Sequence, residues 1–408
     1  MSYFTDFVRG FLDLGATVIL PVVIFLLGLF FRQKIGAAFR SGLTIGVAFV
    51  GIFLVIDLLV KNLGVSLNVI DVGWPATSSI AWASSVAAFI IPLGIIVNVV
   101  LLVTKVTKTM NVDIWNFWHY TFTAAMVYAV SGSIWQALLA AVIFQVICLK
   151  VADWTAPMMS EFFDLPGVSI ATGSTISYAP GIYLVKLLQK VPGLNKLDAD
   201  PETIQKRFGA FGESIFVGLI LGLGIGVLAG YKPGDIINLG MSMAAVMVLM
   251  PRMVKILMEG LMPVSESART WLNKRFGERE IYIGLDAAVA LGHPAVISTA
   301  LILVPITVLL AVILPGNQVL PFGDLATIPF VVAFIVGAAR GNIIHSVIVG
   351  TIMIAISLYI ATDVAPIFTD MAKGTNVQMP KGSSEISSID QGGNIVNYLI
   401  FKLFSLFN

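Results

Sequence analysis

The residues best suited to chemistry lie in semi-polar stretches that interrupt an otherwise apolar chain. Residues 71–84 (DVGWPATSSIAWAS) and 284–295 (GLDAAVALGHPA) each hold a carboxylate and a Gly-X-Pro break before an apolar run, and 166–189 adds a hydroxyl-rich stretch. Polar groups at membrane depth are costly, so they mark candidate sites. The candidate substrate-binding residues are Asp71, Trp74, Thr77, Ser78, Thr172, Ser174, Tyr178, Asp286, His293 and Ser298, together with His119 from an aromatic run at 115–120.

These side chains favour the binding of a neutral, polyhydroxylated solute. Carboxylates accept hydrogen bonds from hydroxyl pairs, and a Trp ring can cover the C–H face of such a solute. Two other interpretations stay open: a Ser or Thr can bond the carbonyl of its own helix, and His119 can belong to an aromatic belt. His293 is the strongest of the three histidines because it precedes a helix-breaking proline, whereas His345 is expected to donate in helix packing.

The composition excludes several classes of protein. Of 408 residues, 58% are apolar and only 12% are charged, with a mean hydropathy of +0.95, which is typical of a polytopic membrane protein. The formal charge of +1 gives no surface for nucleic acid. The single cysteine, Cys148, lies in an apolar run and is expected to be buried, without a disulfide or a metal site. The chain lacks a phosphate-binding GxxxxGK[ST] loop, and we expect no cofactor and no catalytic residue of its own.

Ten apolar runs predict membrane-spanning helices, since a span needs about 20 mainly apolar residues. They lie near 14–31, 43–60, 85–103, 117–131, 134–150, 214–230, 238–256, 296–314, 326–339 and 343–361. Most of the 24 Lys and Arg residues fall inside if the N-terminus is outside. Full crossings by 71–84 or 284–295 would spoil this bias, so we expect re-entrant or broken helices there and a third within 166–189. Residues 395–407 could form one further span.

Short motifs recur in the two halves of the chain. GWPA at 73–76 recurs as GHPA at 292–295, and SGSI at 131–134 corresponds to RGNI at 340–343. Each half holds five spans, an odd number, so the second half would be inverted in the membrane. We therefore predict a first repeat over 1–150, a cytoplasmic linker over 151–212, a second, inverted repeat over 213–365, and a C-terminal tail over 366–408 with a possible last helix.

Inverted repeats with broken helices are typical of alternating-access transporters, which bind their substrate near the midplane. A channel could carry such a repeat but would need the breaks less. We expect the spans 14–60 and 214–256 to form a scaffold, and the broken elements with the spans 85–150 and 296–361 to form the core around the substrate.

Three strings carry a resemblance to a known family. EGLMPVSE at 259–266, GLDAAVALGHP at 284–294 and LPGNQVLPFGDL at 314–325 resemble the galactitol-type membrane component, enzyme IIC, of the bacterial sugar phosphotransferase system (PTS). This family is similar in architecture to the ascorbate-type IIC proteins, whose fold has an inverted repeat, a V-shaped dimer scaffold and a moving core. The resemblance implies that an alditol is bound from outside and then phosphorylated at the inner face by a separate IIB protein bearing a phosphocysteine, which IIA recharges.

The sequence thus predicts an all-α polytopic protein of about 10–11 transmembrane helices plus broken helices, in the inner membrane of a bacterium. The expected function is that of a PTS permease subunit for galactitol or a related alditol. Its expected partners are IIB, IIA, membrane lipid and a second copy of the chain, with no nucleic acid. Asp286 or His293 could act as base toward the accepting hydroxyl. The alternatives are a cation-coupled secondary polyol transporter and a passive channel.

Overall fold

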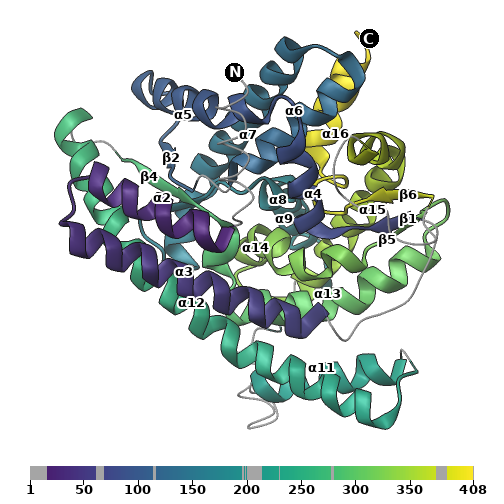
Figure 1. Cartoon of the computed structure of the whole chain (residues 1–408). Coiled ribbons are helices and arrows are strands. Elements are labelled where there is room, and N and C mark those ends of the chain that lie inside the picture. The colour runs from purple at the N-terminus through teal and green to yellow at the C-terminus, as the bar shows by residue number, and fades with distance from the viewer. Residues whose placement is uncertain are drawn as a thin grey trace.

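Helices dominate the computed structural model, which describes residues 16–60, 69–113, 116–194, 197, 199, 214–228, 230–276, 280–373 and 384–407 (Figure 1). Each of the ten predicted apolar runs contains a helix. These helices are α2 (Ala16–Phe30), α3 (Ile35–Val60), α5 (Ala87–Val103), α6 (Phe117–Ser131), α7 (Ile134–Glu161), α11 (Ser214–Leu228), α12 (Pro233–Phe276), α13 (Pro294–Ile313), α14 (Ile328–Ala338) and α15 (Ile343–Lys373). The helical fold class is therefore confirmed. Trp115, most of the linker beyond residue 199 and residues 374–383 of the tail lie outside the described residues.

Helix length separates two groups of candidate spans. Within the described ranges, α7, α13 and α15 are long and apolar enough to cross a membrane, and a bent pair of shorter helices raises this to four. The other predicted spans are not among these candidates. The structure thus has several membrane-spanning helices, and the total of ten or eleven crossings stays a prediction.

The predicted breaks are present as bends and short helices. Helix α4 (Gly73–Ala83) is followed after three residues by α5, and the segments Ala76–Ala83 and Ala87–Val103 meet at 92°. Residues 166–189 form β3 (Val168–Ile170), α8 (Gly173–Ser177) and α9 (Pro180–Leu188). The stretch 284–295 ends β4 (Tyr282–Leu285), passes through the 3₁₀ helix η4 (Ala287–Ala290) and begins α13 at Pro294. Proline at a first helical position lacks only an N–H that would be unpaired there anyway.

Within the described ranges, six very short strands form two parallel sheets, which the sequence did not predict. One sheet has the order β5-β1-β6, with β1 (Val69–Asp71) between β5 (Val319–Leu320) and β6 (Glu385–Ser387). The other has the order β2-β4-β3, with β2 (Thr109–Asn111) and β3 on either side of β4. Strands of two to four residues are too short to show a hydrophobic alternation, so the pattern of the sequence gives no warning of them.

Four helices, α2, α3, α11 and α12, pack against one another, and in Figure 1 α3 and α12 run side by side with α11 beyond α12. Large apolar side chains such as Leu26, Phe39 and Leu54 point outward from α2 and α3. Outward apolar faces suit contact with lipid, where no water competes. The division into scaffold, core and inverted halves stays a prediction. Gly132 lies between α6 and α7 and Gly341 between α14 and α15, and both have a left-handed backbone conformation.

The last helix, α16 (Ile395–Ser405), bears on a question that the sequence left open. Its 11 residues extend about 16 Å, roughly half of the hydrocarbon thickness of a bilayer. Asn394 caps it, Lys402 pairs with Asp363 of α15 at 2.7 Å, and the helix packs against α6 and α7. By length α16 falls short of a single straight span, as does α14, and whether 395–407 crosses the membrane stays a prediction.

Candidate functional site

The ends of the short strands deliver polar side chains to the interior of the molecule. Asp71 ends β1, Asp324 lies in the 3₁₀ helix η5 (Phe322–Thr327) after β5, and the polar segment 388–394 follows β6. Because the carboxyl ends of parallel strands meet at one edge of a sheet, these distant segments converge. In the second sheet, β3 leads to Thr172 and Ser174, and β4 leads to Asp286.

Asp71 and Asp324 form the centre of the first group. Oδ1 of Asp71 accepts the N–H of Gly73 at 2.8 Å, and its Oδ2 accepts the N–H of Ile389 at 3.2 Å. The carboxyls of Asp71 and Asp324 are close enough for their charges to interact. Oδ1 of Asp324 has no hydrogen-bond partner within the described ranges.

The segment after β6 closes over this pair. Ser388 donates to Oδ2 of Asp324 at 2.5 Å, and the N–H of Asp390 donates to the same oxygen at 3.2 Å. Gln391 donates through Nε2 to Oδ1 of Asp390 at 3.0 Å, and Asn397 of α16 donates to Oε1 of Gln391 at 2.9 Å. All five side chains are buried. The C-terminal segment is thus built into the interior and is not a loose tail.

Ser174 joins the C-terminal segment to α6. Its hydroxyl lies 3.1 Å from Nε2 of His119 and receives Nε2 of Gln391 at 3.4 Å. Nδ1 of His119 lies 2.9 Å from the carbonyl of Asn116, which can only accept, so Nδ1 carries a proton. In a neutral ring Nε2 is then an acceptor, which the hydroxyl of Ser174 can satisfy.

Asp286 forms the other side of the site. Its Oδ2 accepts the hydroxyl of Thr172 at 3.1 Å and its Oδ1 accepts the N–H of Ala288 at 2.8 Å. Thr172 in turn accepts the N–H of Ala287 at 2.9 Å. Asp286 is close enough to Asp390 for their charges to interact. We call Asp71, Asp286, Asp324 and Asp390 the aspartate cluster.

The structure brings together about half of the residues proposed from the sequence. Asp71, His119, Thr172, Ser174 and Asp286 bond directly within or around the aspartate cluster, and Tyr178 is buried near Asp324 and Asp390. Trp74 contributes its backbone N–H to Asp324. None of these contacts tests whether a residue touches substrate.

The remaining candidates have other surroundings. Thr77 donates to the carbonyl of Gly73 at 2.8 Å, so its hydroxyl bonds the backbone of its own helix, as in the alternative interpretation of such residues. Ser78 of α4 and Ser298 of α13 are buried. His293 caps α13 by accepting the N–H of Ala295 at 3.2 Å, and its ring packs against those of Phe162 and Phe163.

Sequence reasoning missed the residues contributed by η5 and by the chain end. These are Asp324, Ser388, Asp390, Gln391, Asn394 and Asn397. Residues 387–397 (SSIDQGGNIVN) do carry the signal used for 71–84, namely a carboxylate, hydroxyls and glycines directly before an apolar helix. The Gly and Ser content of 371–394 was instead interpreted as a polar tail.

Internal hydrogen bonds already engage most polar groups of the aspartate cluster. Two cavities in the described part of the chain lie elsewhere, one of about 560 Å³ beside Arg32 and Trp271, the other of about 390 Å³ beside Lys186 and Arg340. A solute entering the cluster must therefore replace existing hydrogen bonds with its own, which selects for a ligand rich in hydroxyls.

Comparisons with known proteins identify the family. The family model for PTS system sugar-specific permease components, EIIC-GAT, matches residues 10–382. The chain is 43% identical over 414 residues to the PTS system galactitol-specific EIIC component of Escherichia coli K12, which covers 98% of this chain and 91% of that protein. The corresponding protein of strain O157:H7 matches equally, and a putative permease IIC component of K12 is 39% identical over 97% of this chain and 93% of its own length.

A family match over nearly the whole chain agrees with the apolar helices and the buried polar centre. Membership implies an integral protein of the bacterial inner membrane that handles a sugar-type substrate together with other PTS proteins. The comparisons give no support to a cation-coupled secondary transporter. The chain belongs to the sugar-specific permease components of the phosphotransferase system, the EIIC-GAT family.

Proposed function

We propose that this chain is a PTS permease subunit for galactitol or a closely related alditol, and that the aspartate cluster binds the alditol. The observation that carries the proposal is the excess of acceptors at the cluster. Four carboxyls and the ring of His119 converge there, and their partners within the described ranges are hydroxyls and amides, with no Lys or Arg. The 43% identity to a galactitol-specific relative supports the same substrate class.

An alditol supplies what such a site lacks. Each hydroxyl of an alditol can donate one hydrogen bond and accept another, so a solute with hydroxyls along its whole length can satisfy several carboxyls at once. Oδ1 of Asp324, which has no hydrogen-bond partner within the described ranges, is one such position. Replacing a hydroxyl by hydrogen would leave a buried carboxylate unpaired, which costs about 1–3 kcal/mol or more. The site should therefore discriminate strongly against deoxy analogues.

Phosphorylation requires a partner, because transfer depends on in-line positioning of the acceptor and the donor. In the proposed reaction an alditol hydroxyl oxygen attacks the phosphorus carried by the cysteine sulfur of IIB, the P–S bond breaks, and the hydroxyl proton passes to a carboxylate. We assign this base to Asp286, whose Oδ2 accepts the hydroxyl of Thr172. His293 is the second candidate, since it lies on the same segment.

The test is uptake and phosphorylation of a small alditol panel by vesicles with and without IIB and IIA. We expect phosphorylated product only when both proteins are present, and binding of the unmodified alditol to fall at least about tenfold in Asp390→Asn, while the exposed Asp370→Asn serves as the matched control. Accumulation of unmodified alditol under an ion gradient would favour secondary transport. Rapid equilibration without any partner would favour a channel.

We further propose that two chains pair through α2 and α3, and that the halves of the chain are inverted. Outward apolar side chains on these helices support the pairing. Cysteines placed along α3 should cross-link between protomers. The inversion predicts that Lys34 and Lys232 label from opposite sides of the membrane, and labelling from the same side would contradict it.

A further inference from the structure

A second polar feature lies away from the aspartate cluster, in the cavity of about 390 Å³ between α7, α9 and the end of α14. Its volume is within the range of small-molecule sites, roughly 300–1,000 Å³. The lining includes Trp154, Glu161 and Phe162 of α7, together with Lys186 and Arg340. We call this cavity the vestibule.

The walls of the vestibule continue into the elements that carry the aspartate cluster. Helix α14 follows directly on η5, which holds Asp324, and Arg340 comes just after its other end. With a rise of 1.5 Å per residue, the 11 residues of α14 extend about 16 Å between these two segments. Likewise α9 follows the segment that holds Ser174 and ends near Lys186.

Aromatic rings form the boundary between the vestibule and the segment of Asp286. The ring of Phe162, which lines the vestibule, lies 4.4 Å from the ring of His293, and the ring of Phe163 lies 5.6 Å from it. His293 ends the segment that begins with Asp286. Tilted and edge-to-face rings therefore lie between the vestibule and the segment of Asp286.

The charges of the vestibule suit an anion. Arg340 has its nearest carboxylate, Glu161, at 4.0 Å, and the side chains are 85% and 71% exposed, so this pairing is weak. Nζ of Lys186 lies 5.8 Å from the centre of the Tyr183 ring, which stacks on Trp154 at 5.2 Å. Two cations against one carboxylate leave a net positive rim.

Arg340 has an unusual backbone conformation. Its φ of 52° is left-handed, a conformation that glycine adopts far more easily, and it occupies the position after α14 where helices usually place glycine. The N–H groups of Arg340 and Gly341 bond the carbonyls of Gly337 and Val336 in the Schellman pattern. This turn fixes the backbone from which the Arg340 side chain reaches the rim of the vestibule.

We infer that the vestibule binds a phosphate ester through Arg340 and Lys186, and specifically the alditol phosphate that leaves after phosphorylation. This rests on the proposed function. Guanidinium groups bind phosphate oxygens in pairs, and a phosphate monoester is close to a dianion at neutral pH, matching two cations. A neutral alditol gains little from the same rim, so the vestibule favours the product over the substrate.

The test uses the full chain in nanodiscs of neutral lipid, titrated with a hexitol phosphate and, separately, with the unmodified hexitol. Arg340→Gly relieves the strained backbone and removes only the side chain. Lys105→Gly is a matched control, because Lys105 has φ of 64° after α5 and the same pair of backbone bonds, to Leu102 and Leu101. We expect Arg340→Gly to weaken binding of the hexitol phosphate about tenfold, with Lys105→Gly and hexitol binding unchanged.

Each outcome decides the inference. Equal affinity of wild type and Arg340→Gly for the hexitol phosphate would overturn it, as would no binding by the wild type. An effect of Arg340→Gly seen only in nanodiscs with anionic lipid would assign the rim to lipid headgroups and overturn it too. If Arg340→Gly changed only the binding of phosphorylated IIB, the rim would be assigned to that protein and the inference would be overturned. If the wild type did not bind the unmodified hexitol, this result would instead contradict the proposed function.

Discussion

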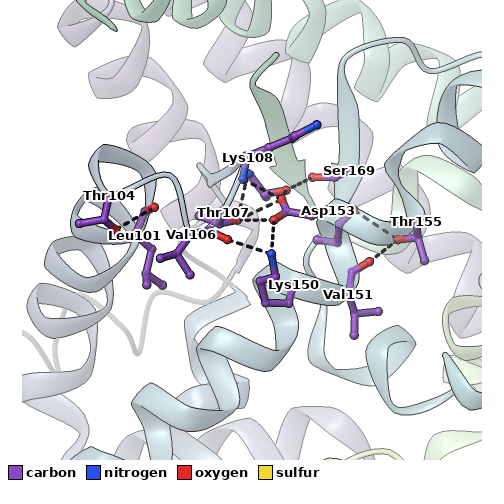
Figure 2. Close-up of polar contacts among 12 residues, drawn as sticks. Leu101, Thr104, Val106, Thr107, Lys108, Lys150, Val151, Asp153, Thr155 and Ser169 are labelled. Carbon is purple, nitrogen blue, oxygen red and sulfur yellow. Dashed lines mark hydrogen bonds and ion pairs between the residues drawn. The ribbon is translucent and has the colours of Figure 1, made fainter. Parts of the chain in front are cut away.

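Asp153 of α7 should be among the most sensitive positions for stability. Its carboxylate accepts the hydroxyl of Thr107 at 3.0 Å and that of Thr109 at 2.8 Å, and the N–H of Lys108 at 3.0 Å, while Lys150 lies 3.6 Å away (Figure 2). Thr109 begins β2, so this carboxylate ties the start of the second sheet to α7.

The magnitude follows from what Asp153→Ala leaves behind. A hydrogen bond to a charged group contributes about 1.5–3 kcal/mol, and such values do not add for neighbours. Thr109 keeps Ser169 as a partner at 3.1 Å, and the exposed N–H of Lys108 can turn to water. The buried hydroxyl of Thr107 loses its only acceptor among its described contacts. We therefore expect a loss of about 3 kcal/mol of unfolding free energy, and about half of that for Asp153→Asn.

The assay is reversible unfolding in mixed micelles, followed by tryptophan fluorescence. Asp370→Ala is the control, because it removes an ion pair with Lys373 whose side chains are 61% and 67% exposed, and should cost under about 0.5 kcal/mol. Hydrogen exchange at residues 109–111 adds a local readout, since these amides should open first in Asp153→Ala. If Asp153→Ala proved no less stable than the control, the carboxylate would not be the anchor described here.

Two further substitutions test the interior. Gly323→Ala should abolish alditol binding and lower the free energy of unfolding, because a β-carbon there would collide with the backbone oxygen of Asp71. Gly36→Ala in α3 is the control: a β-carbon at Gly36 has no atom within 4 Å, so this variant should behave as wild type in the same binding and unfolding assays. His293→Ala should impair transport more than His345→Ala, since His293 caps α13 beside the vestibule while His345 bonds the carbonyl of Leu194; equal rates of uptake would reverse this ranking.

The sequence predicted the helices well because burial in lipid is a one-dimensional signal. A run of about 20 apolar residues has few other uses, so the bounds of α6, for example, agree with the run at 117–131. The breaks were predictable for a related reason, because Gly-X-Pro cannot continue a helix at 71–84 or 284–295.

The site was only partly predictable because it depends on contacts between distant residues. The bond from Ile389 to Asp71 joins residues 318 positions apart, and the bond from Gln391 to Ser174 joins residues 217 apart. No local pattern in 384–397 indicates which sheet that segment joins, since β6 has three residues. Its polar residues resembled a tail until the strand pairing placed them.

The charges of the aspartate cluster and of the vestibule also give the proposed cycle a direction. Beside the aspartate cluster, a phosphate monoester would meet carboxylates with no cation among their described partners, and two like unit charges 4 Å apart repel by about 4 kcal/mol at an effective dielectric constant of 20. The vestibule offers Arg340 and Lys186 instead. Phosphorylation would therefore move the favoured position of the solute from the aspartate cluster to the vestibule. Hexitol phosphate should accordingly fail to compete with bound hexitol, and competition at neutral pH would contradict this account.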